Sequence, residues 1–373
     1  MPNNRLSKIV DAVRPVLAEQ AAEHDARNLF VEPNYTLLKS HGFFGAAVPE
    51  ALGGLGASHA ELCDALRSLA QACPATALAL SMHQHLVAAT VWKHRHGQGG
   101  EPLLQRIAKE QLVLVSTGAG DWFESNGTMQ AVDGGYSVTA KKQFCSGALA
   151  GGLLVTSSVF EHPSEGTQVL HFAVPFSAKG VSVANDWDTL GMRGTGSHSV
   201  QLDAVFVPEQ SIVVRRPRAG WPPVWSVVLT VAPPIFMSPY LGVAEAARDR
   251  ALEWARARVR PETPLLVGEM ENALTAARLA WRQMIDNAAE YDFAPDIERA
   301  NQALIAKTLL TNAVVQTVNR AMEVVGGAAY FRRTGIERLL RDVQAAPYHP
   351  LPERRQQALT GRLALGLDPL SAA

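Results

Sequence analysis

The chain has 373 residues, of which 47% are hydrophobic and 18% charged, so it can bury a large core and should divide into two or three structural units. Its 34 Lys and Arg residues nearly balance its 35 Asp and Glu residues. This balance excludes recognition of nucleic acid or of an anionic membrane through an overall positive field.

The three cysteines, Cys63, Cys73 and Cys145, follow no metal-binding spacing. An odd number of thiols argues against a disulfide framework and suits a reducing compartment. Residues 1–22 carry charges throughout and have no apolar core of the signal-peptide type. A cytoplasmic location is therefore expected.

Apolar residues at helical spacing dominate residues 1–112. In residues 6–17 and again in residues 62–70 they recur every three or four positions, which is typical of helices packed on a core. The glycine-rich residues 43–56 lie between these helices without a G-x-G-x-x-G spacing, so a structural turn is favoured over a nucleotide-binding loop. We predict an N-terminal helical domain over residues 1–112.

Four histidines lie on the helix predicted for residues 74–96. His83 and His85, like His94 and His96, are two positions apart, so the members of each pair point to opposite sides of a helix. Neither pair can chelate a metal ion, and no metal site is expected. One of His83 and His85 should face the core, either as a hydrogen-bonded core histidine or as an active-site histidine.

The hydrophobic period changes at residue 113. Short apolar segments bounded by turn residues predict strands, and residues 133–135 (DGG) are a hairpin signal. The number and spacing of the segments predict a compact β-domain, a barrel or sandwich, over residues 113–215. The predicted strands are residues 113–117, 129–132, 136–140, 153–157, 168–174, 181–184 and 198–207.

Helical spacing returns in residues 222–373. Residues 224–243 are uncharged for long enough to resemble a membrane span, but Pro233, Pro234 and Pro239 interrupt them. We interpret them as a buried central helix entered through an irregular proline-rich turn. Long helices predicted at residues 241–259, 265–291 and 297–325 indicate an antiparallel bundle, so the fold class is α+β with helical, β and helical domains in order.

Several strings, taken in order, resemble the acyl-CoA dehydrogenase superfamily of flavoproteins over nearly the whole chain. No single string is sufficient, and their order and spacing carry the resemblance. The resemblance implies an N-terminal helical domain, a central β-domain and a C-terminal four-helix bundle. The strings are VPE at residues 48–50 with Gly53, Gly54 and Gly56, KKQFCS at 141–146, LGMRGTGS at 190–197, VFVP at 205–208, VVGG at 324–327, IER at 336–338 and RD at 341–342.

The resemblance also implies a flavin, FAD or FMN, between the β-domain and the C-terminal bundle. By matching position, Ser116 and Thr117 face the flavin ring, and Phe144 and Ser146 lie against its face and its edge. Small hydroxyls and backbone amides can hydrogen-bond the polar edge of the ring while an aromatic side chain packs on it.

The flavin of this family usually reaches a neighbouring subunit, so a homotetramer or homodimer is expected. Gly326 and Gly327 match the place where the backbone comes close to the partner's cofactor tail. The pair Ser146 and Gly147 is similar to the Ser-Gly at the flavin edge of the flavin-dependent monooxygenases that share this fold.

Acyl-CoA dehydrogenases abstract a substrate α-proton with a glutamate, and neither family position holds a carboxylate here. One position matches Pro350 and the other falls in residues 232–234 (APP), so α,β-dehydrogenation has no obvious base. A Thr-Glu-Pro-Gly-Ala-Gly-Ser run of the family is shortened to STGAGD at residues 116–121. An arginine-aromatic-glycine string is replaced by arginines within residues 256–260. These differences argue against standard contacts with acyl-CoA and with an adenine dinucleotide.

His349 follows Arg341 and Asp342 at the offset where the related monooxygenases keep a catalytic histidine, and their early-helix histidine is matched by His85 or His83. A histidine with a pKa near neutral can take a proton from a phenol, amine or thiol. The resemblance then implies that reduced flavin from a separate reductase reacts with oxygen in a pocket that excludes water from a small-molecule substrate.

Residues 347–352 (PYHPLP) contain three prolines and have two interpretations. They form either a stiff surface connector before a last helix at residues 353–367 or a rigid support that holds His349 over a ring. We favour an active-site His349 and interpret Arg341 and Asp342 as an ion pair that fixes the connector. The leading functional hypothesis is a flavin-dependent monooxygenase. The alternatives are an atypical acyl-CoA or acyl-carrier-protein dehydrogenase and a non-catalytic binding module that retains the fold.

Overall fold

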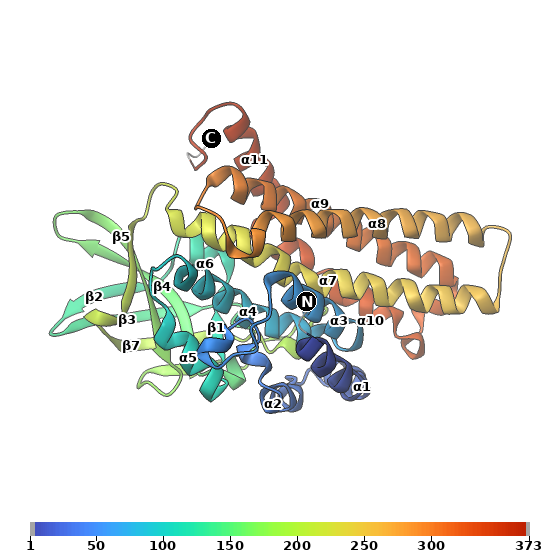
Figure 1. Cartoon of the computed structure of the whole chain (residues 1–373), viewed down its shortest axis with the longest axis horizontal. Helices are drawn as coiled ribbons and strands as arrows, with labels where there is room; N and C mark the ends of the chain where they lie inside the picture. The colour runs from blue at the N-terminus through green and yellow to red at the C-terminus, as the bar shows by residue number, and fades with distance from the viewer. Residues whose placement is uncertain (1–3, 371–373) are drawn as a thin grey trace.

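Helices α1–α5 form the N-terminal part of the computed structural model, which describes residues 4–370 (Figure 1). The capping box of Ser58 and Glu61 begins α3, because each side chain accepts a hydrogen bond from the other residue's amide. The predicted helical region is confirmed. Its elements are α1 (Asn4–Ala26), α2 (Glu32–Ser40), α3 (His59–Ala72), α4 (Pro74–Arg95) and α5 (Glu101–Glu110), with the short turns η1 (Phe43–Gly45) and η2 (Glu50–Leu52).

Eight strands form one mixed sheet in the order β6-β7-β3-β2-β4-β5-β8, with β1 parallel to β4. The β2–β3 hairpin turns where it was predicted, at residues 133–134. Strand β8 and the short helix α6 (Ala119–Phe123) were not predicted. The strands are β1 (Leu114–Ser116), β2 (Thr128–Val132), β3 (Gly135–Lys142), β4 (Leu153–His162), β5 (Gly166–Pro175), β6 (Val181–Val183), β7 (Val200–Pro208) and β8 (Ile212–Pro217).

Helix α7 (Pro223–Ala257) runs through the centre of the molecule. It is continuous across Pro233, Pro234 and Pro239, so the predicted irregular proline-rich turn is wrong. Each proline removes one helical hydrogen bond, but residues 229–247 are all buried and tertiary packing outweighs that loss. By length and composition α7 could cross a membrane, yet 94% of its apolar window is buried inside the fold, as expected for a core helix.

The remaining helices pack on α7 or, in the case of the last one, on its neighbour α9. Asp296 caps α9 by accepting from the amides of Glu298 and Arg299, and Gly326 ends it with a positive φ of 71°, as predicted. The last helix starts at the expected residue but ends three positions early. The helices are α8 (Thr263–Ala288), α9 (Ile297–Val325), α10 (Ile336–Val343) and α11 (Glu353–Ala364).

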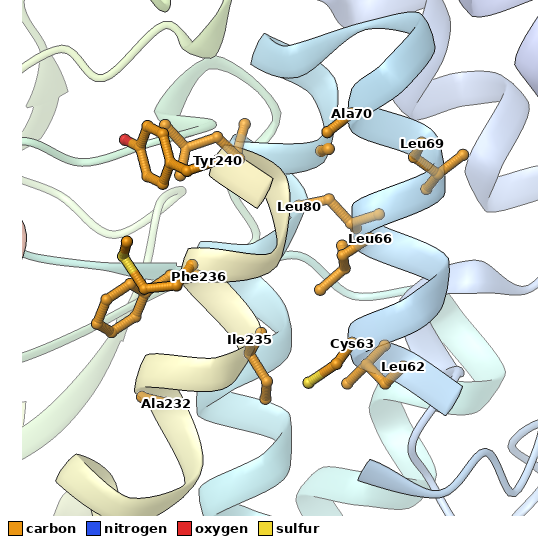
Figure 2. Close-up of a cluster of buried hydrophobic side chains, with 14 of the residues drawn as sticks. Leu62, Cys63, Leu66, Leu69, Ala70, Leu80, Ala232, Ile235, Phe236 and Tyr240 are labelled. Carbon is orange, nitrogen blue, oxygen red and sulfur yellow. The ribbon is translucent and has the colours of Figure 1, made fainter. Parts of the chain in front are cut away.

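The two faces of α7 have different neighbours. One face packs on α3 and α4, where Ile235 points towards Cys63 and Leu66 (Figure 2). Phe236 and Tyr240 point away from α3 on the other side of α7 (Figure 2). Helix α4 also contacts β1, so it connects the sheet to the helical core. The arrangement leaves the second face of α7 to carry the aromatic side chains of the candidate site.

Candidate functional site

A histidine–tyrosine pair lies where α7 meets the connector that follows α10. The connector turns through η9 (Ala346–Tyr348) and places His349 against two α7 side chains one turn apart. The hydroxyl of Tyr240 lies 2.6 Å from Nε2 of His349. The ring of Phe236 stacks on the imidazole, with centroids 5.1 Å apart and an interplanar angle of 17°. Together the two contacts fix the position and the rotation of the imidazole ring.

Lys307 ties this connector to α9. Its Nζ donates to the backbone carbonyls of His349 (3.0 Å) and Leu351 (3.2 Å), and only 1% of the residue is exposed. Burial lowers the pKa of Lys307 to about 8, so the ammonium remains mainly charged at neutral pH. Carbonyl dipoles therefore solvate a buried cation beside His349 and hold the connector in place.

The imidazole of His349 is neutral at neutral pH. Burial, with smaller contributions from Lys307 and His85, lowers its pKa to about 3, which corrects the expectation of a value near neutral. Burial also raises the pKa of Tyr240 well above its ordinary value, so the phenol keeps its proton. Nε2 of His349 is the partner that the structure gives the Tyr240 hydroxyl, so we assign the phenol as the donor and place the proton of the neutral imidazole on Nδ1. His349 thus offers an Nδ1–H donor.

Both early-helix histidines are buried, because α4 is covered by α7 on one side and by β1 on another. Nε2 of His83 lies 2.9 Å from the carbonyl of Phe44, and its Nδ1 accepts from the amide of Leu114 at 2.9 Å. His83 is therefore a hydrogen-bonded core histidine. Nδ1 of His85 is buried and lacks a hydrogen-bond partner at normal distance. Burial lowers the pKa of His85 to about 4, and the backbone of Ser81 opposes this lowering in part. Of the two, His85 is the one close enough to His349 to contribute to the lowering of its pKa.

Arg341 and Asp342 do not pair with each other, so the predicted ion pair is wrong. They are consecutive on α10 and point in different directions. Arg341 binds the carboxylates of Asp25 (2.6 Å) and Glu337 (2.8 Å). Asp342 accepts from the amide of Met192 at 2.6 Å. Both residues fix the segment before His349, but through partners elsewhere in the chain.

Three segments meet at one edge of the β-domain: the end of β1, residues 143–147 and residues 192–199. The amide of Gly118 donates to the carbonyl of Gln143 at 2.9 Å, and the amide of Gly147 donates to the carbonyl of Thr195 at 3.0 Å. These bonds bring together five of the residues predicted to bind a flavin. They are Ser116, Thr117, Phe144, Ser146 and Gly147.

Phe144 is displayed at this edge. Its side chain is 61% exposed on a backbone with φ of 56°, and its ring packs edge-on against Trp187. Gly147 has φ of 73°, and a Cβ there would lie 2.8 Å from the hydroxyl of Tyr35. Glycine is required because the loop turns through a left-handed conformation directly over that ring.

Ser146 is the outer end of a row of hydroxyls. Its Oγ lies 2.7 Å from Oγ of Ser197, which lies 2.8 Å from Oγ1 of Thr195. The hydroxyl of Thr195 donates to the carbonyl of Met192 at 2.9 Å. Thr195 and Ser197 are buried, whereas Ser146 is partly exposed. Ser146 is therefore the member of the row that a ligand can reach.

Thr117 does not offer a free hydroxyl proton to a ligand. It donates to Asp121 at 2.6 Å, and the same carboxylate receives Lys142 at 2.6 Å and Thr156 at 3.0 Å. Lys142 and Asp121 form a buried ion pair that fixes the end of β1 beside the loop carrying Phe144. Within this network Ser116 is buried at the end of β1.

Gly326 and Gly327 lie far along the bundle from these residues. They follow the end of α9, near Arg260 in the connection between α7 and α8. In Figure 1 this connection is at the end of the bundle opposite the sheet. Any contact of these glycines with a flavin would therefore involve the flavin of another subunit.

The residues at the β-domain edge fit a flavin. An exposed aromatic ring, a reachable hydroxyl and loops in left-handed conformations suit a flat ring with a polar edge. Among the residues that the structure describes, no group of three His, Cys, Asp or Glu side chains is arranged to hold a metal ion.

Two family models match most of the helical parts of the chain. Residues 6–110 match the acyl-CoA dehydrogenase N-terminal domain, and residues 235–352 match its C-terminal domain. The chain belongs to the acyl-CoA dehydrogenase superfamily. The match confirms the predicted family and the three-part fold.

Within the superfamily, several relatives are named as monooxygenases or nitrososynthases. The chain is 28% identical over 359 residues to the putative acyl-CoA dehydrogenase YdbM of Bacillus subtilis, covering 89% of each chain. It is 27% identical over 366 residues to the amino sugar nitrososynthase DnmZ of Streptomyces peucetius (93% and 89% covered). It is also 27% identical over 352 residues to the probable FMNH2-dependent monooxygenase SfnC of Pseudomonas putida (89% and 88% covered).

A solved structure shows the same fold. The structure of KijD3 in complex with FMN and a dTDP-linked 3-amino-4-keto sugar superimposes with a TM-score of 0.88 at 26% identity, covering 98% of this chain and 94% of KijD3. The fold neighbour thus holds FMN together with an amino sugar nucleotide.

Three residues of the candidate site escaped prediction: Phe236, Tyr240 and Lys307. The two aromatics are four positions apart in an apolar helix, a spacing that also occurs in ordinary cores. Lys307 lies among apolar residues on the predicted face of α9, and a lysine on a buried face is a usable signal for a buried charge.

Proposed function

We propose that this protein is a flavin-dependent monooxygenase that takes reduced FMN from a separate reductase and transfers one oxygen atom of O2 to a small organic substrate. The observation that carries the proposal is His349. A neutral imidazole, held by Tyr240 and Phe236, lies in the segment where dehydrogenases of the superfamily place their glutamate base. The names of SfnC and DnmZ and the FMN held by KijD3 support this proposal.

Bound reduced FMN would supply two electrons for the activation of O2, so that substrate, O2 and reduced FMN yield oxygenated substrate, water and FMN. Phe144, Ser146 and Ser116 would hold the ring at the β-domain edge. The Nδ1–H of His349 would donate a hydrogen bond to the oxygen being transferred or to the substrate, and the apolar surroundings of α7 would keep water out.

The substrate would be a small molecule with a nucleophilic atom, such as the nitrogen of an amino sugar or the sulfur of a thioether. DnmZ is named for an amino sugar, and KijD3 was solved with an amino sugar nucleotide. The dehydrogenase alternative requires a carboxylate base near His349. Among the described residues, the buried acid of this region is Asp342, whose carboxylate is already bound by the amide of Met192.

The test uses the purified protein, FMN, NADH and a flavin reductase under ¹⁸O2, with a panel of amino sugar nucleotides, thioethers and phenols. We expect one ¹⁸O atom in a product, detected by mass spectrometry, and no product when the protein is omitted. Bleaching of bound flavin by an acyl-CoA without oxygen would instead establish a dehydrogenase. A protein that binds neither oxidised nor reduced flavin would contradict both functions.

We also propose a homotetramer or homodimer in the cytoplasm. Large apolar side chains are exposed on α8, α9 and the turn after α9, including Leu279 (66%), Leu309 (59%) and Tyr330 (86%). Such side chains are typical of surfaces that another subunit covers. The three cysteines are free and buried, which is compatible with a reducing compartment. Light scattering on the purified protein measures the oligomeric state, and a monomer would contradict it.

A further inference from the structure

The hydroxyl row that ends at Ser146 has a defined direction. Thr195 has one hydroxyl hydrogen, and a carbonyl oxygen can only accept, so the 2.9 Å contact with Met192 commits that hydrogen. Thr195 must then accept from Ser197 across 2.8 Å. The single hydrogen of Ser197 is thereby committed as well, and Ser197 must accept from Ser146 across 2.7 Å.

The direction of the row decides what Ser146, its exposed end, can offer to a ligand. The hydroxyl hydrogen of Ser146 points inward to Ser197, so towards a ligand Ser146 has only lone pairs. The loop cannot easily reorient to change this, because the amide of Gly147 is bound to the carbonyl of Thr195 and Gly147 packs on Tyr35. Ser197 and Thr195 are 6% and 0% exposed, so water does not compete for their hydrogens.

We propose that Thr195 and Ser197 are positioning residues that make Ser146 a hydrogen-bond acceptor, so that the site prefers reduced over oxidised flavin. The inference rests on the proposed function, which places the polar edge of the flavin at Ser146. Oxidised flavin has an acceptor nitrogen at N5, whereas reduction adds a hydrogen there and makes it a donor. An acceptor at Ser146 therefore stabilises reduced flavin by accepting a hydrogen bond from N5–H. With oxidised flavin, the lone pairs of Ser146 Oγ and of N5 face each other and repel.

The direction of the row explains how the chain can take reduced flavin from solution and release it after oxidation. One hydrogen bond contributes modestly in water-exposed sites, so the preference from this contact is about threefold to tenfold in the ratio of dissociation constants. Ser197 and Thr195 are buried behind Ser146, so they act on a ligand through Ser146 and take no part in the redox chemistry.

The experiment measures the dissociation constants of oxidised FMN and of anaerobically reduced FMN by fluorescence titration. In Ser197→Ala the hydroxyl of Ser146 is free to rotate and donate outward, so we expect the oxidised-to-reduced ratio to fall by about threefold to tenfold. Thr195→Val should act in the same direction, because Ser197 then loses its acceptor and can donate to Ser146. Thr195→Ser keeps the hydroxyl and is the matched control, with an unchanged ratio.

An unchanged ratio in both Ser197→Ala and Thr195→Val, with circular dichroism and thermal unfolding as in the wild type, would overturn the inference. The same result is expected if Ser146 faces a ring nitrogen that carries hydrogen in both redox states. The ¹⁸O assay separates this outcome from failure of the proposed function. Oxygenated product with an unchanged ratio refutes only the inference, whereas absence of product and of flavin binding refutes the function.

Discussion

The amide of Met192 donates to the carboxylate of Asp342 across 2.6 Å and joins the β-domain to α10. Met192 has φ of 52°, and its carbonyl accepts from Thr195, so the same residue anchors the hydroxyl row that ends at Ser146. Asp342 lies near the end of α10, directly before the connector that carries His349. One contact between two domains therefore positions both parts of the candidate site.

Asp342→Asn should change how stability depends on pH. Burial raises the pKa of Asp342 to about 6, above the 3.8 of an exposed aspartate. The folded state therefore binds this proton more tightly than the unfolded state does. The stabilisation of the fold by the protonated carboxyl is complete below pH ~4 and is lost as pH rises through 6. Asparagine keeps an oxygen for the amide of Met192 and has no proton to lose.

Urea unfolding at pH 5 and pH 8 measures this difference. The free energy of unfolding of Asp342→Asn, relative to the wild type, should be higher at pH 8 than at pH 5, by about 1.4 kcal/mol. Asp188→Asn, at an exposed acid of the β-domain, is the control and should show no such change. A difference that is the same at both pH values would contradict the buried, raised-pKa carboxyl.

Tyr240→Phe should lower oxygenation by disturbing His349 without removing it. The substitution deletes the donor to Nε2, so the imidazole loses its defined tautomer and one of its two fixed contacts. We expect a decrease of about tenfold or more in product formation per reduced FMN consumed, with the remainder appearing as hydrogen peroxide. His349→Ala should decrease it further, and the double variant should be no worse than His349→Ala.

A double-mutant cycle measures that coupling. Additive losses for Tyr240→Phe and His349→Ala would show that the two side chains act independently. Retained product formation in His349→Ala would remove His349 from the active site.

Lys307→Met should loosen the connector that carries His349. The substitution removes the donors to the carbonyls of His349 and Leu351 and leaves both buried without that partner. We expect a loss of about 1–3 kcal/mol in the free energy of unfolding and faster hydrogen–deuterium exchange in residues 346–352. Lys179→Met, at an exposed position, is the control. Unchanged exchange in the connector would show that Lys307 does not hold it.

Gly191→Ala should undock the β-domain turn from α10. A Cβ at Gly191 would lie 2.2 Å from the carbonyl oxygen of Arg341, and a backbone atom cannot move aside cheaply. We expect a loss of about 1–3 kcal/mol or more in thermal unfolding experiments. Gly268→Ala is the matched control, because a Cβ there meets nothing within 4 Å on helix α8, and it should raise stability by about 0.5–1 kcal/mol. Equal effects of the two substitutions would contradict the docking.

Much of the fold follows from local pattern. Period and turn residues predicted the order of helices, strands and helices, the β2–β3 hairpin and the end of α9 at Gly326. The prolines of α7 misled the prediction, since a local rule for helix breaking does not include the burial that keeps that helix intact.

The candidate site was predicted in part. The order of the family strings pointed to His349 and to the loop with Phe144 and Ser146, because those residues lie close together in sequence within recognisable strings. Tyr240 lies 109 positions from His349, and Asp25 lies 316 positions from Arg341. No local spacing signals either contact.

Composition, periodicity and motif order thus determined the domain sequence, the flavoprotein family and the histidine at position 349. Only the tertiary structure decided that burial keeps His349 neutral while Tyr240 orients it, that Arg341 and Asp342 bind different partners, and that the hydroxyl of Ser146 points inward. Protonation and hydrogen-bond direction depend on burial and on partners brought together by packing, and a sequence read along one dimension contains neither.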